Sequence, residues 1–484
     1  MIKYLRAGYP LLAVETADER AFVTRAYEEL SSFAQERGTT IQVFWHRQTG
    51  LEQITGPPGR SEPARATLQE AVQQARAASR TVVFLSDLQR ILQNPGVYRV
   101  LLDAIPALRR NQSMLVLLAP HFDLPQELLH EIAVLVDPLP TREQLRRPLD
   151  VVVRGSNAAV EDEAALLDAA AGLTTLEAEN AFALSVIERG KLDPEVVWRE
   201  KMRLVRQTGY LEVWQPVSPD RVGGLDLLKH YIAEEVVPSK DDPDLRVRGI
   251  LLVGVPGTGK SLSAKAAAAL LGWPVLRMDI GALKGSLVGQ SEANIRAALR
   301  LADAVAPAVL WIDEIEKGVG GYRSSAVTDG GTTLSMVGTL LTWMQEHESP
   351  VIVIATCNDY SKLPTELTRP GRFDERFFVD LPTSTERVEI ARIHIRRFQE
   401  DDGAAEVAAE LEGYTGAEIE AAVKSAARRT GRRITAEALR EAARAIRPIA
   451  ETAAEEIQAL RTWARRALRP ASSSQEDPLI RTML

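Results

Sequence analysis

The sequence predicts an α/β protein built from two parallel β-sheets, one in each half of the chain, with helices on the faces of each sheet. Short apolar, β-capable runs alternate with helical stretches along both halves, which is the pattern of parallel strands joined by crossover helices. In the second half, one such run leads directly into a glycine-rich turn that ends in lysine and serine. At 484 residues the chain is also too long for one core, and about two to four folding units are expected.

Composition narrows the class of protein. Hydrophobic residues make up 45% and charged residues 26%, which is the balance of a soluble globular protein. No apolar run approaches the roughly 20 residues that cross a bilayer, and the short apolar stretch near the N-terminus fits a buried strand better than a signal peptide. Cys357 is the one cysteine, so there is no disulfide framework and we expect a cytoplasmic protein.

A phosphate-binding loop is the strongest motif. The run 249–253 reads as a buried strand, residues 254–261 match GxxxxGKS, and an alanine-rich helix follows to about Gly272. In this context glycines let backbone N–H groups converge on phosphates, while the helix N-terminus adds the positive end of its dipole. Lys260 is expected to reach the β- and γ-phosphates, and Ser261 to offer its hydroxyl to Mg²⁺. A chance match is the alternative, because glycine-rich turns between a strand and a helix are common. The expected ATP-binding residues of this loop are Pro256, Gly257, Thr258, Gly259, Lys260, Ser261 and Leu262.

Two more predicted strands end in residues suited to hydrolysis. Residues 308–312 lead into Asp313 and Glu314, and residues 351–355 lead towards Asn358. Ligands bind at the carboxyl ends of strands in open α/β sheets. Asp313 is therefore expected to hold Mg²⁺, and Glu314 to orient and deprotonate the attacking water. Asn358 either positions the same water or simply forms a turn, where asparagine is favoured.

Together with residues 367–374, these strands resemble the AAA ATPase module, a P-loop NTPase fold of a parallel sheet plus a helical lid, and its protein-remodelling clade in particular. The resemblance covers about residues 221–447. It implies that a Gly-Gly loop covers the adenine, that a lid histidine lies beside the base, and that a Gly-Ala pair replaces the second-sensor arginine. The residues in these positions are Gly223, Gly224, His394, Gly416 and Ala417.

Arg369 and Arg372 align with the arginine fingers of that clade, which act on ATP held by the neighbouring subunit. A finger supplies positive charge as negative charge develops on the transferred phosphoryl group. Spacing alone would equally allow a solvated turn around Pro370 and Gly371. By resemblance, the chain is expected to form a homo-oligomeric ring, with a hexamer as the expected assembly.

The sequence departs from the clade at its pore loops. Leu287 replaces the aromatic residue that grips substrate, which weakens the case for forceful threading of polypeptide. The next loop is rich in glycine; Tyr322 is a candidate for the missing ring, but a mobile loop is the preferred interpretation. The Leu-Val-Gly pore segment, this loop and residues 341–345 resemble the divergent AAA family known from algal plastids, cyanobacteria and other bacteria.

The first half resembles a damaged copy of the second. The run LPQEL at 124–128 matches LPTEL at 363–367, and VDPLPT at 136–141 matches VDLPT at 379–383. Residues 172–177 echo residues 413–418. The predicted first strand, however, runs into residues 15–20, which contain no glycine or lysine and carry carboxylates where phosphates would lie. Like charges there would repel a nucleotide. An unrelated α/β domain with chance echoes is the alternative.

The sequence therefore divides into five expected parts. These are a degenerate AAA-like α/β domain without nucleotide motifs (1–145), a helical lid and linker (146–215), an AAA ATPase large subdomain (216–383), its helical lid (384–450), and a C-terminal helix with a flexible tail (451–484), in which the tail begins at about Ala471.

These features predict Mg²⁺-dependent ATP hydrolysis by a ring that remodels an unidentified protein or protein complex; no HExxH protease motif is present. A slow nucleotide-gated scaffold or regulatory switch, whose N-terminal domain holds a partner, is the main alternative. A nucleic-acid-dependent AAA protein is a further alternative. The formal charge of −8 and the aromatic content of 5% disfavour it.

Overall fold

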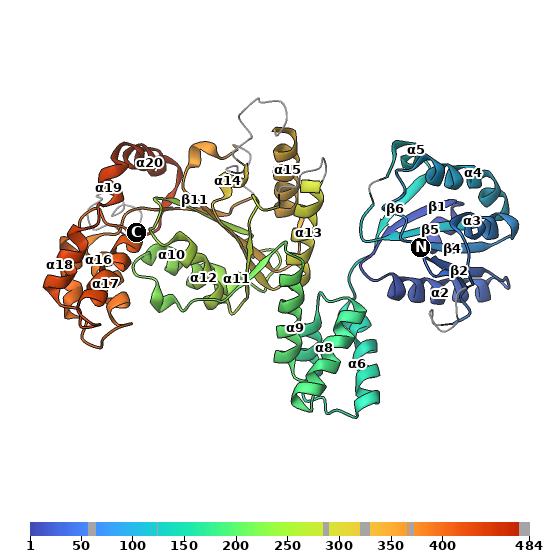
Figure 1. Ribbon diagram of the computed structural model, residues 1–484, viewed down its shortest axis with the longest axis horizontal. Coiled ribbons are helices and arrows are strands. Elements are labelled where there is room, and N and C mark those ends of the chain that lie inside the picture. The colour runs from blue at the N-terminus through green and yellow to red at the C-terminus, as the bar shows by residue number, and fades with distance from the viewer. Residues whose placement is uncertain are drawn as a thin grey trace. The chain divides into compact units, whose positions relative to one another are not determined.

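The computed structural model contains two compact units, Met1–Trp198 and Arg199–Leu484 (Figure 1). Each unit has a mostly parallel sheet and a set of lid helices, which confirms the predicted α/β architecture. Within the residues that the structure describes, no helix is long and apolar enough to cross a membrane. The described residues are 1–56, 64–122, 124–283, 290–319, 330–364, 367 and 372–473.

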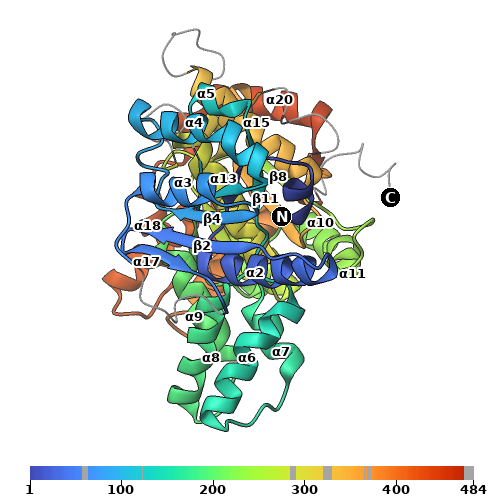
Figure 2. The same ribbon diagram turned by 90° about the vertical axis from the view of Figure 1, so that its right-hand side faces the viewer.

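The first unit is built on a six-stranded sheet in the order β3-β2-β4-β5-β1-β6. All neighbouring strands pair in parallel except β2 and β3, which form a hairpin. Helix α2 packs on one face, and α3 and α4 pack on the other (Figure 2). The central strands β4 and β5 are buried at every residue, because helices cover both faces. The elements are α1 (Ile2–Arg6), β1 (Leu11–Glu15), α2 (Glu19–Glu36), β2 (Gln42–Arg47), β3 (Gly50–Gln53), α3 (Leu68–Ala77), β4 (Thr81–Ser86), α4 (Pro95–Asn111), β5 (Met114–Ala119), α5 (Gln126–Leu129) and β6 (Ile132–Val136).

Four helices follow this sheet: α6 (Arg142–Ser156), α7 (Glu163–Ala170), α8 (Thr175–Arg189) and α9 (Pro194–Gln207). Helix α6 contacts both α7 and α8. Asn157 ends α6 and Gly190 ends α8, each in the left-handed conformation that asparagine and glycine favour at helix C-termini.

The second unit is built on a seven-stranded sheet in the order β13-β12-β8-β11-β10-β9-β7. Neighbours pair in parallel, except that β7 pairs antiparallel with β9. Helices α10 and α12 cover one face, while α13 and α15 cover the other (Figure 1). The elements are β7 (Glu212–Trp214), α10 (Asp226–Tyr231), α11 (Val237–Ser239), β8 (Gly249–Gly254), α12 (Lys260–Leu271), β9 (Val275–Met278), α13 (Gln290–Val305), β10 (Ala308–Ile312), α14 (Ile315–Val319), α15 (Gly330–Glu346), β11 (Val351–Cys357) and β12 (Glu375–Val379).

A second lid follows β12. It consists of α16 (Ser384–Ile395), the 3₁₀ segment η4 (Gly403–Glu410), α17 (Gly416–Arg429) and α18 (Ala436–Arg444). Its core consists mainly of alanine, isoleucine, leucine and valine side chains, contributed by all four elements.

The C-terminal part differs from the sequence prediction in two ways. The expected helix is split at Ala453 into α19 (Ile449–Thr452) and α20 (Ala454–Ala467). The start of the expected tail, residues 471–473, is ordered. It follows β13 (Arg469–Pro470), which pairs with β12, and Ser473 N donates to Asp226 Oδ1 at 2.8 Å. Ala471 is buried and its N–H bonds to Phe378 O at 2.9 Å. A small side chain that fits against the sheet, together with a free strand edge, explains why this segment is ordered.

The two units share one plan, which supports the repeat interpretation over chance echoes. In both sheets the strands run in the spatial order fifth, first, fourth, third, second, namely β6-β1-β5-β4-β2 and β12-β8-β11-β10-β9. The lids match as well, because α6 and α16 both begin with a threonine capping box, and so do α8 and α17. A capping box satisfies two of the N–H groups that a helix start leaves without partners. The four capping threonines are Thr141, Thr174, Thr383 and Thr415.

Close pairing of β8 with β12 depends on Gly254, the last residue before the phosphate loop. A Cβ atom there would lie 2.0 Å from Val379 O, so we expect Gly254→Ala to destabilise the second unit by about 1–3 kcal/mol. Gly338→Ala is the matched control: Gly338 is exposed on α15, its Cβ would meet nothing within 4 Å, and alanine in a helix stabilises by about 0.5–1 kcal/mol. Differential scanning calorimetry measures both. Equal melting of Gly254→Ala and wild type would contradict this packing.

Candidate active site

The phosphate loop joins β8 to α12. Gly257 and Gly259 have φ angles of 82° and 99°, in the left-handed region that glycine adopts without strain. A Cβ atom on Gly257 would also approach Thr415 Oγ1 to 3.1 Å and Ala417 Cβ to 3.2 Å. Gly259 is the N-cap of α12, and no side chain caps this helix. The first N–H groups of α12 are therefore available to an anion.

Lys260 is buried inside this loop. Its Nζ donates to Gly254 O and Val255 O, each at 2.8 Å. Burial lowers the pKa of Lys260 to about 8, because a desolvated ammonium is less stable than a hydrated one. The loop thus holds a cation close to its own carbonyl groups, where negatively charged phosphates would stabilise the protonated form.

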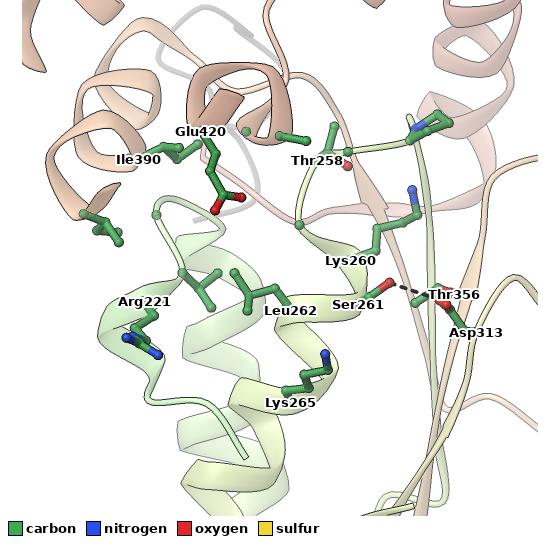
Figure 3. Close-up of a pocket in the computed structure, with 18 of the residues that line it drawn as sticks. Arg221, Thr258, Lys260, Ser261, Leu262, Lys265, Asp313, Thr356, Ile390 and Glu420 are labelled. Carbon is green, nitrogen blue, oxygen red and sulfur yellow. Dashed lines mark hydrogen bonds between the residues drawn. The ribbon is translucent and has the colours of Figure 1, made fainter. Parts of the chain in front are cut away.

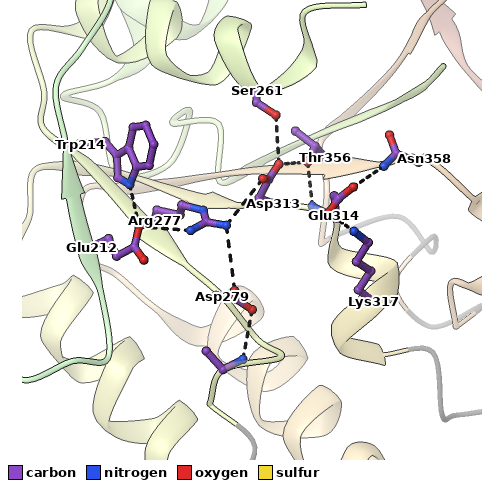
Figure 4. A network of polar contacts seen from close by, with 11 residues as sticks. Glu212, Trp214, Ser261, Arg277, Asp279, Asp313, Glu314, Lys317, Thr356 and Asn358 are labelled. Atoms are coloured by element: carbon purple, nitrogen blue, oxygen red, sulfur yellow. Dashed lines mark hydrogen bonds and ion pairs between the residues drawn. The ribbon is translucent and has the colours of Figure 1, made fainter. Parts of the chain in front are cut away.

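Two hydroxyl groups bond to the carboxylate of Asp313, the residue that follows β10. Ser261 Oγ donates to Asp313 Oδ1 at 3.0 Å, and Thr356 Oγ1 donates to the same oxygen at 2.9 Å (Figure 4). Thr356 Oγ1 also accepts from Glu314 N at 2.9 Å. Glu314 has a φ angle of 49°, so Thr356 holds both the carboxylate of Asp313 and the unusual backbone turn after it.

Glu314 is oriented by two neighbours. Asn358 Nδ2 donates to Glu314 Oε1 at 2.8 Å, and Lys317 Nζ forms an ion pair with Oε2 (Figure 4). The backbone of Asn358 is held in turn, since its N–H donates to Glu316 Oε1 at 3.0 Å. The asparagine side chain, for which the sequence allowed a simple turn role, is therefore bonded directly to the carboxylate expected to act on water.

These residues line a cavity of about 540 Å³ between the sheet edge and the lid (Figure 3). The lid side is packed closely: a Cβ atom on Gly223 would lie 2.6 Å from Ile390 Cγ1, and Ala417 N bonds to Gly257 O at 3.1 Å. The sequence-predicted residues that line the cavity are Gly223, Pro256, Gly257, Thr258, Gly259, Lys260, Ser261, Leu262, Asp313, Glu314, Asn358, His394, Gly416 and Ala417.

His394 brings an unpaired polar atom to this cavity. Burial lowers the pKa of His394, which favours the neutral ring. Its Nδ1 is buried without a hydrogen-bond partner in the described part of the chain. Such an atom is costly unless a ligand or water satisfies it. Together with the uncapped α12 and the Ser261–Asp313 pair, it makes the cavity a good fit for a nucleotide with a divalent cation.

Other predicted residues lie elsewhere. Gly224 is outside the lining, and its N–H donates to Glu389 Oε2 at 2.8 Å. Arg372 is also outside the lining. Arg369, Leu287 and Tyr322 fall outside the described residues.

The sequence analysis missed several lining residues, namely Arg221, Val222, Lys265, Thr356, Ile390, Ile393 and Glu420. Two of them carried a usable signal. Thr356 ends the same strand that leads to Asn358, and Glu420 lies one helical turn after Gly416, on the same face of α17. The lid isoleucines carried no signal of their own, because apolar residues of a helix mark its packed face whether or not a ligand lies there.

A chain of contacts links this site to β7, the edge strand. Arg277 Nη1 donates to Glu212 Oε2 at 3.1 Å, and Arg277 Nη2 lies 3.8 Å from Asp313 Oδ2 (Figure 4). Lys265 Nζ, from a residue of the cavity lining, lies 3.9 Å from the centre of the Trp214 ring. The edge strand is therefore in polar and cation–π contact with the site.

The corresponding place in the first unit is filled by its own side chains. Asp18 caps α2, with its carboxylate accepting from Ala21 N at 2.9 Å. Ser86 Oγ, at the end of β4, donates to Glu19 Oε2 at 2.5 Å, and burial raises the pKa of Glu19. Asp87 has a φ angle of 64° and corresponds to Glu314. The helix start that corresponds to the uncapped N-terminus of α12 is thus occupied by a carboxylate here.

Models of known protein families match both units of the chain. Residues 250–381 match the "ATPase family associated with various cellular activities (AAA)". Residues 1–136 match the "SpoVK-like AAA ATPase, N-terminal domain", and residues 130–208 match the "SpoVK-like AAA ATPase, second domain".

Individual relatives also belong to the AAA proteins, and two of them match along most of this chain. The chain is 30% identical over 480 residues to the AAA domain-containing protein ycf46 of Guillardia theta, covering 95% of this chain and 93% of that protein. It is 29% identical over 479 residues to the ycf46 protein of Pyropia yezoensis, covering 95% and 96%. It is also 34% identical over 234 residues to the ATP-dependent zinc metalloprotease FtsH of Syntrophus aciditrophicus, covering 46% of this chain and 32% of that protein. The chain belongs to the AAA ATPase family, and within it to the ycf46 group of AAA domain-containing proteins.

Proposed function

We propose that the chain is a subunit of a cytoplasmic, hexameric ring that hydrolyses ATP with Mg²⁺ and uses the energy to remodel a protein or protein complex. The observation that carries this proposal is the placement of Glu314. It lies at the cavity, bonded to Asn358 at 2.8 Å and next in sequence to the Ser261–Asp313 pair. A relative that shares the ATPase module, FtsH, is ATP-dependent by name.

The ligand roles follow from the contacts. Lys260 and the N–H groups at the start of α12 would bind the phosphates. Ser261 Oγ and the Asp313 carboxylate, 3.0 Å apart, would hold Mg²⁺, which neutralises negative charge on phosphate oxygens when it is bound. Gly223 and His394 would lie beside the base. The Gly416–Ala417 pair, which contacts the phosphate loop through Ala417 N, would lie over the phosphates. Gly224 would act only indirectly, by holding Glu389 of the lid.

The proton of the attacking water would pass to Glu314. Asn358 and Lys317 fix the carboxylate from either side, so its orientation does not have to be established at the moment of reaction. Thr356 fixes the backbone of the same residue. These three neighbours would position the base and would not themselves exchange protons.

The position of Arg372 supports a finger that acts on a neighbouring subunit. Asp374 Oδ2 accepts from Gly249 N at 2.9 Å, and Asp374 N donates to Gly249 O at 2.9 Å, which ties this segment to the start of β8. The phosphate loop follows the other end of β8, roughly 16 Å away at about 3.3 Å per residue. An arginine side chain does not span that distance, so the ATP that Arg372 serves would belong to the next subunit. Arg369 is proposed for the same role.

A slow nucleotide-gated scaffold is the second candidate. The closed site of the first unit favours it, because a domain that keeps its fold without a ligand site is free to hold a partner instead. The two proposals differ in turnover: a remodelling ATPase is expected to be stimulated by its protein substrate, whereas a scaffold is not.

Mixing two variants that are each expected to be inactive tests whether Arg372 of one subunit completes the active site of its neighbour. Arg372→Ala keeps its own cavity but lacks the finger, while Glu314→Gln keeps the finger but lacks the base. In randomly mixed rings about one interface in four joins an intact cavity to an intact finger. We expect an equimolar mixture to recover up to about a quarter of the wild-type ATP turnover.

Each variant assayed alone is the control, together with a gel-filtration check that both assemble. An inactive mixture of well-assembled variants would mean that Arg372 does not act between subunits. Full activity of Arg372→Ala alone would remove its catalytic role altogether.

Thr356 gives an independent test of how Glu314 is positioned. Thr356→Val keeps the shape of the side chain but leaves Glu314 N without its acceptor. We expect ATP turnover to fall about 10- to 100-fold, while ADP affinity changes by less than about threefold. Thr356→Ser restores the hydroxyl and should stay within about threefold of wild type. Single-turnover kinetics and calorimetric ADP titrations measure the two quantities, and wild-type turnover in Thr356→Val would rule out the positioning role.

A further inference from the structure

Glu420 is a carboxylate that the proposed ATPase mechanism does not use, yet it lines the cavity. It projects from α17 towards Leu262, between Ile390 on one side and Thr258 on the other (Figure 3). A negative charge inside a site for a negatively charged ligand is costly unless it meets a hydrogen-bond donor.

The position of Glu420 along α17 indicates which part of a nucleotide it would face. The start of α17 touches the phosphate loop, since Ala417 N bonds to Gly257 O at 3.1 Å. Glu420 follows three residues later, about 4.5 Å along the helix axis. On its other side, Ile390 packs against Gly223, where a Cβ atom would lie 2.6 Å from Ile390 Cγ1. Glu420 therefore lies between the phosphate loop and the apolar end of the cavity.

One oxygen of Glu420 is already committed to protein partners. Lys424 Nζ lies 2.7 Å, Arg397 Nη1 3.1 Å and His394 Nδ1 3.8 Å from Oε1. No hydrogen bond within the described ranges reaches Oε2. The carboxylate is thus held through Oε1, and Oε2 has its acceptor capacity unused within the described residues.

The carboxylate is ionised at neutral pH. Burial alone would raise the pKa of Glu420, but the Lys424 hydrogen bond and the attraction of His394, Lys424 and Arg397 hold it below its ordinary value. An ionised carboxylate only accepts hydrogen bonds. Between the phosphates and the base of a nucleotide, the hydrogen-bond donors are the ribose hydroxyls.

We propose that Glu420 is a specificity-determining residue that accepts a hydrogen bond from a ribose hydroxyl and so selects ribonucleotides over deoxyribonucleotides. This inference rests on the proposed placement of the nucleotide in this cavity. In dinucleotide-binding folds too, a carboxylate accepts a hydrogen bond from a ribose hydroxyl. His394 lies next to this carboxylate, with its Nδ1 3.8 Å from Glu420 Oε1.

The test is equilibrium binding of diphosphates, which are not hydrolysed, by isothermal titration calorimetry on the full chain. We expect wild type to bind ADP about tenfold more tightly than either 2′-deoxy-ADP or 3′-deoxy-ADP, whichever lacks the hydroxyl that Glu420 meets; a tenfold ratio corresponds to about 1.4 kcal/mol. Glu420→Gln should lower ADP affinity to that of the discriminated deoxy analogue and leave the affinity for that analogue unchanged.

Three results would overturn the proposal. The first is equal binding of all three diphosphates by wild type. The second is equal weakening of all three by Glu420→Gln, as a role in lid closure would give. The third is that Glu420→Gln abolishes discrimination against inosine diphosphate, which lacks the amino group of adenine, and leaves discrimination against the deoxy analogues intact. The last result would assign Glu420 to the base.

Two control variants distinguish the role of Glu420 from nucleotide binding at the cavity in general. Lys424→Gln removes a partner of Oε1 and keeps the carboxylate, so discrimination should remain within about threefold because Arg397 still holds that oxygen. Glu437→Gln makes the same chemical change on α18, outside the cavity lining, and should change nothing. Failure of wild type to bind ADP would contradict the proposed function, whereas ADP binding without sugar discrimination would contradict only the role of Glu420.

Discussion

Whether a unit of this chain can bind phosphate depends on one feature: the group that bonds to the free N–H groups at the start of the helix after the first parallel strand. A helix begins with backbone N–H groups that have no partner within the helix, and a side chain, water or a ligand must bind them. In the second unit Gly259 begins α12 without a side-chain cap, which leaves the place open to phosphate. In the first unit Asp18 caps α2, and its carboxylate already holds the position that an anion would take.

The shared plan of the two units shows which features folding needs and which only the ligand needs. Both units keep the same order of five parallel strands and the same threonine capping boxes in the lid. In the first unit, polar side chains at the carboxyl ends of its strands contact one another: His121 Nδ1 lies 2.6 Å from Glu15 Oε1, and Arg25 Nη2 lies 2.7 Å from Asp137 Oδ2. Strand order and caps stabilise the fold whether or not a nucleotide binds, so they persist when the phosphate loop is lost.

Much of the fold and of the candidate site could be predicted from the sequence, because the strongest sequence signals are local. A strand, a glycine-rich loop and a helix in succession predict the phosphate site, and Asp313 with Glu314 follows a run of apolar residues that could only be a buried strand. The ordered segment around Ala471 and the roles of Thr356 and Glu420 depend on contacts between distant parts of the chain. Ala471 bonds to Phe378, and Thr356 bonds to Asp313 and Glu314. Spacing could have placed Thr356 and Glu420 near the site, but it does not encode their contacts. A serine-rich terminus usually frays, and a threonine suits any strand.

The measurement that tests the central claim most directly is the number of nucleotides bound per chain. Calorimetric titration of the full-length protein with ADP should give one site per chain in wild type. The same titration of Lys260→Ala should give no measurable site, because the remaining place is filled by Asp18. Two sites per chain in wild type, or one site retained in Lys260→Ala, would show that the first unit binds nucleotide and would contradict the account of one open and one closed site.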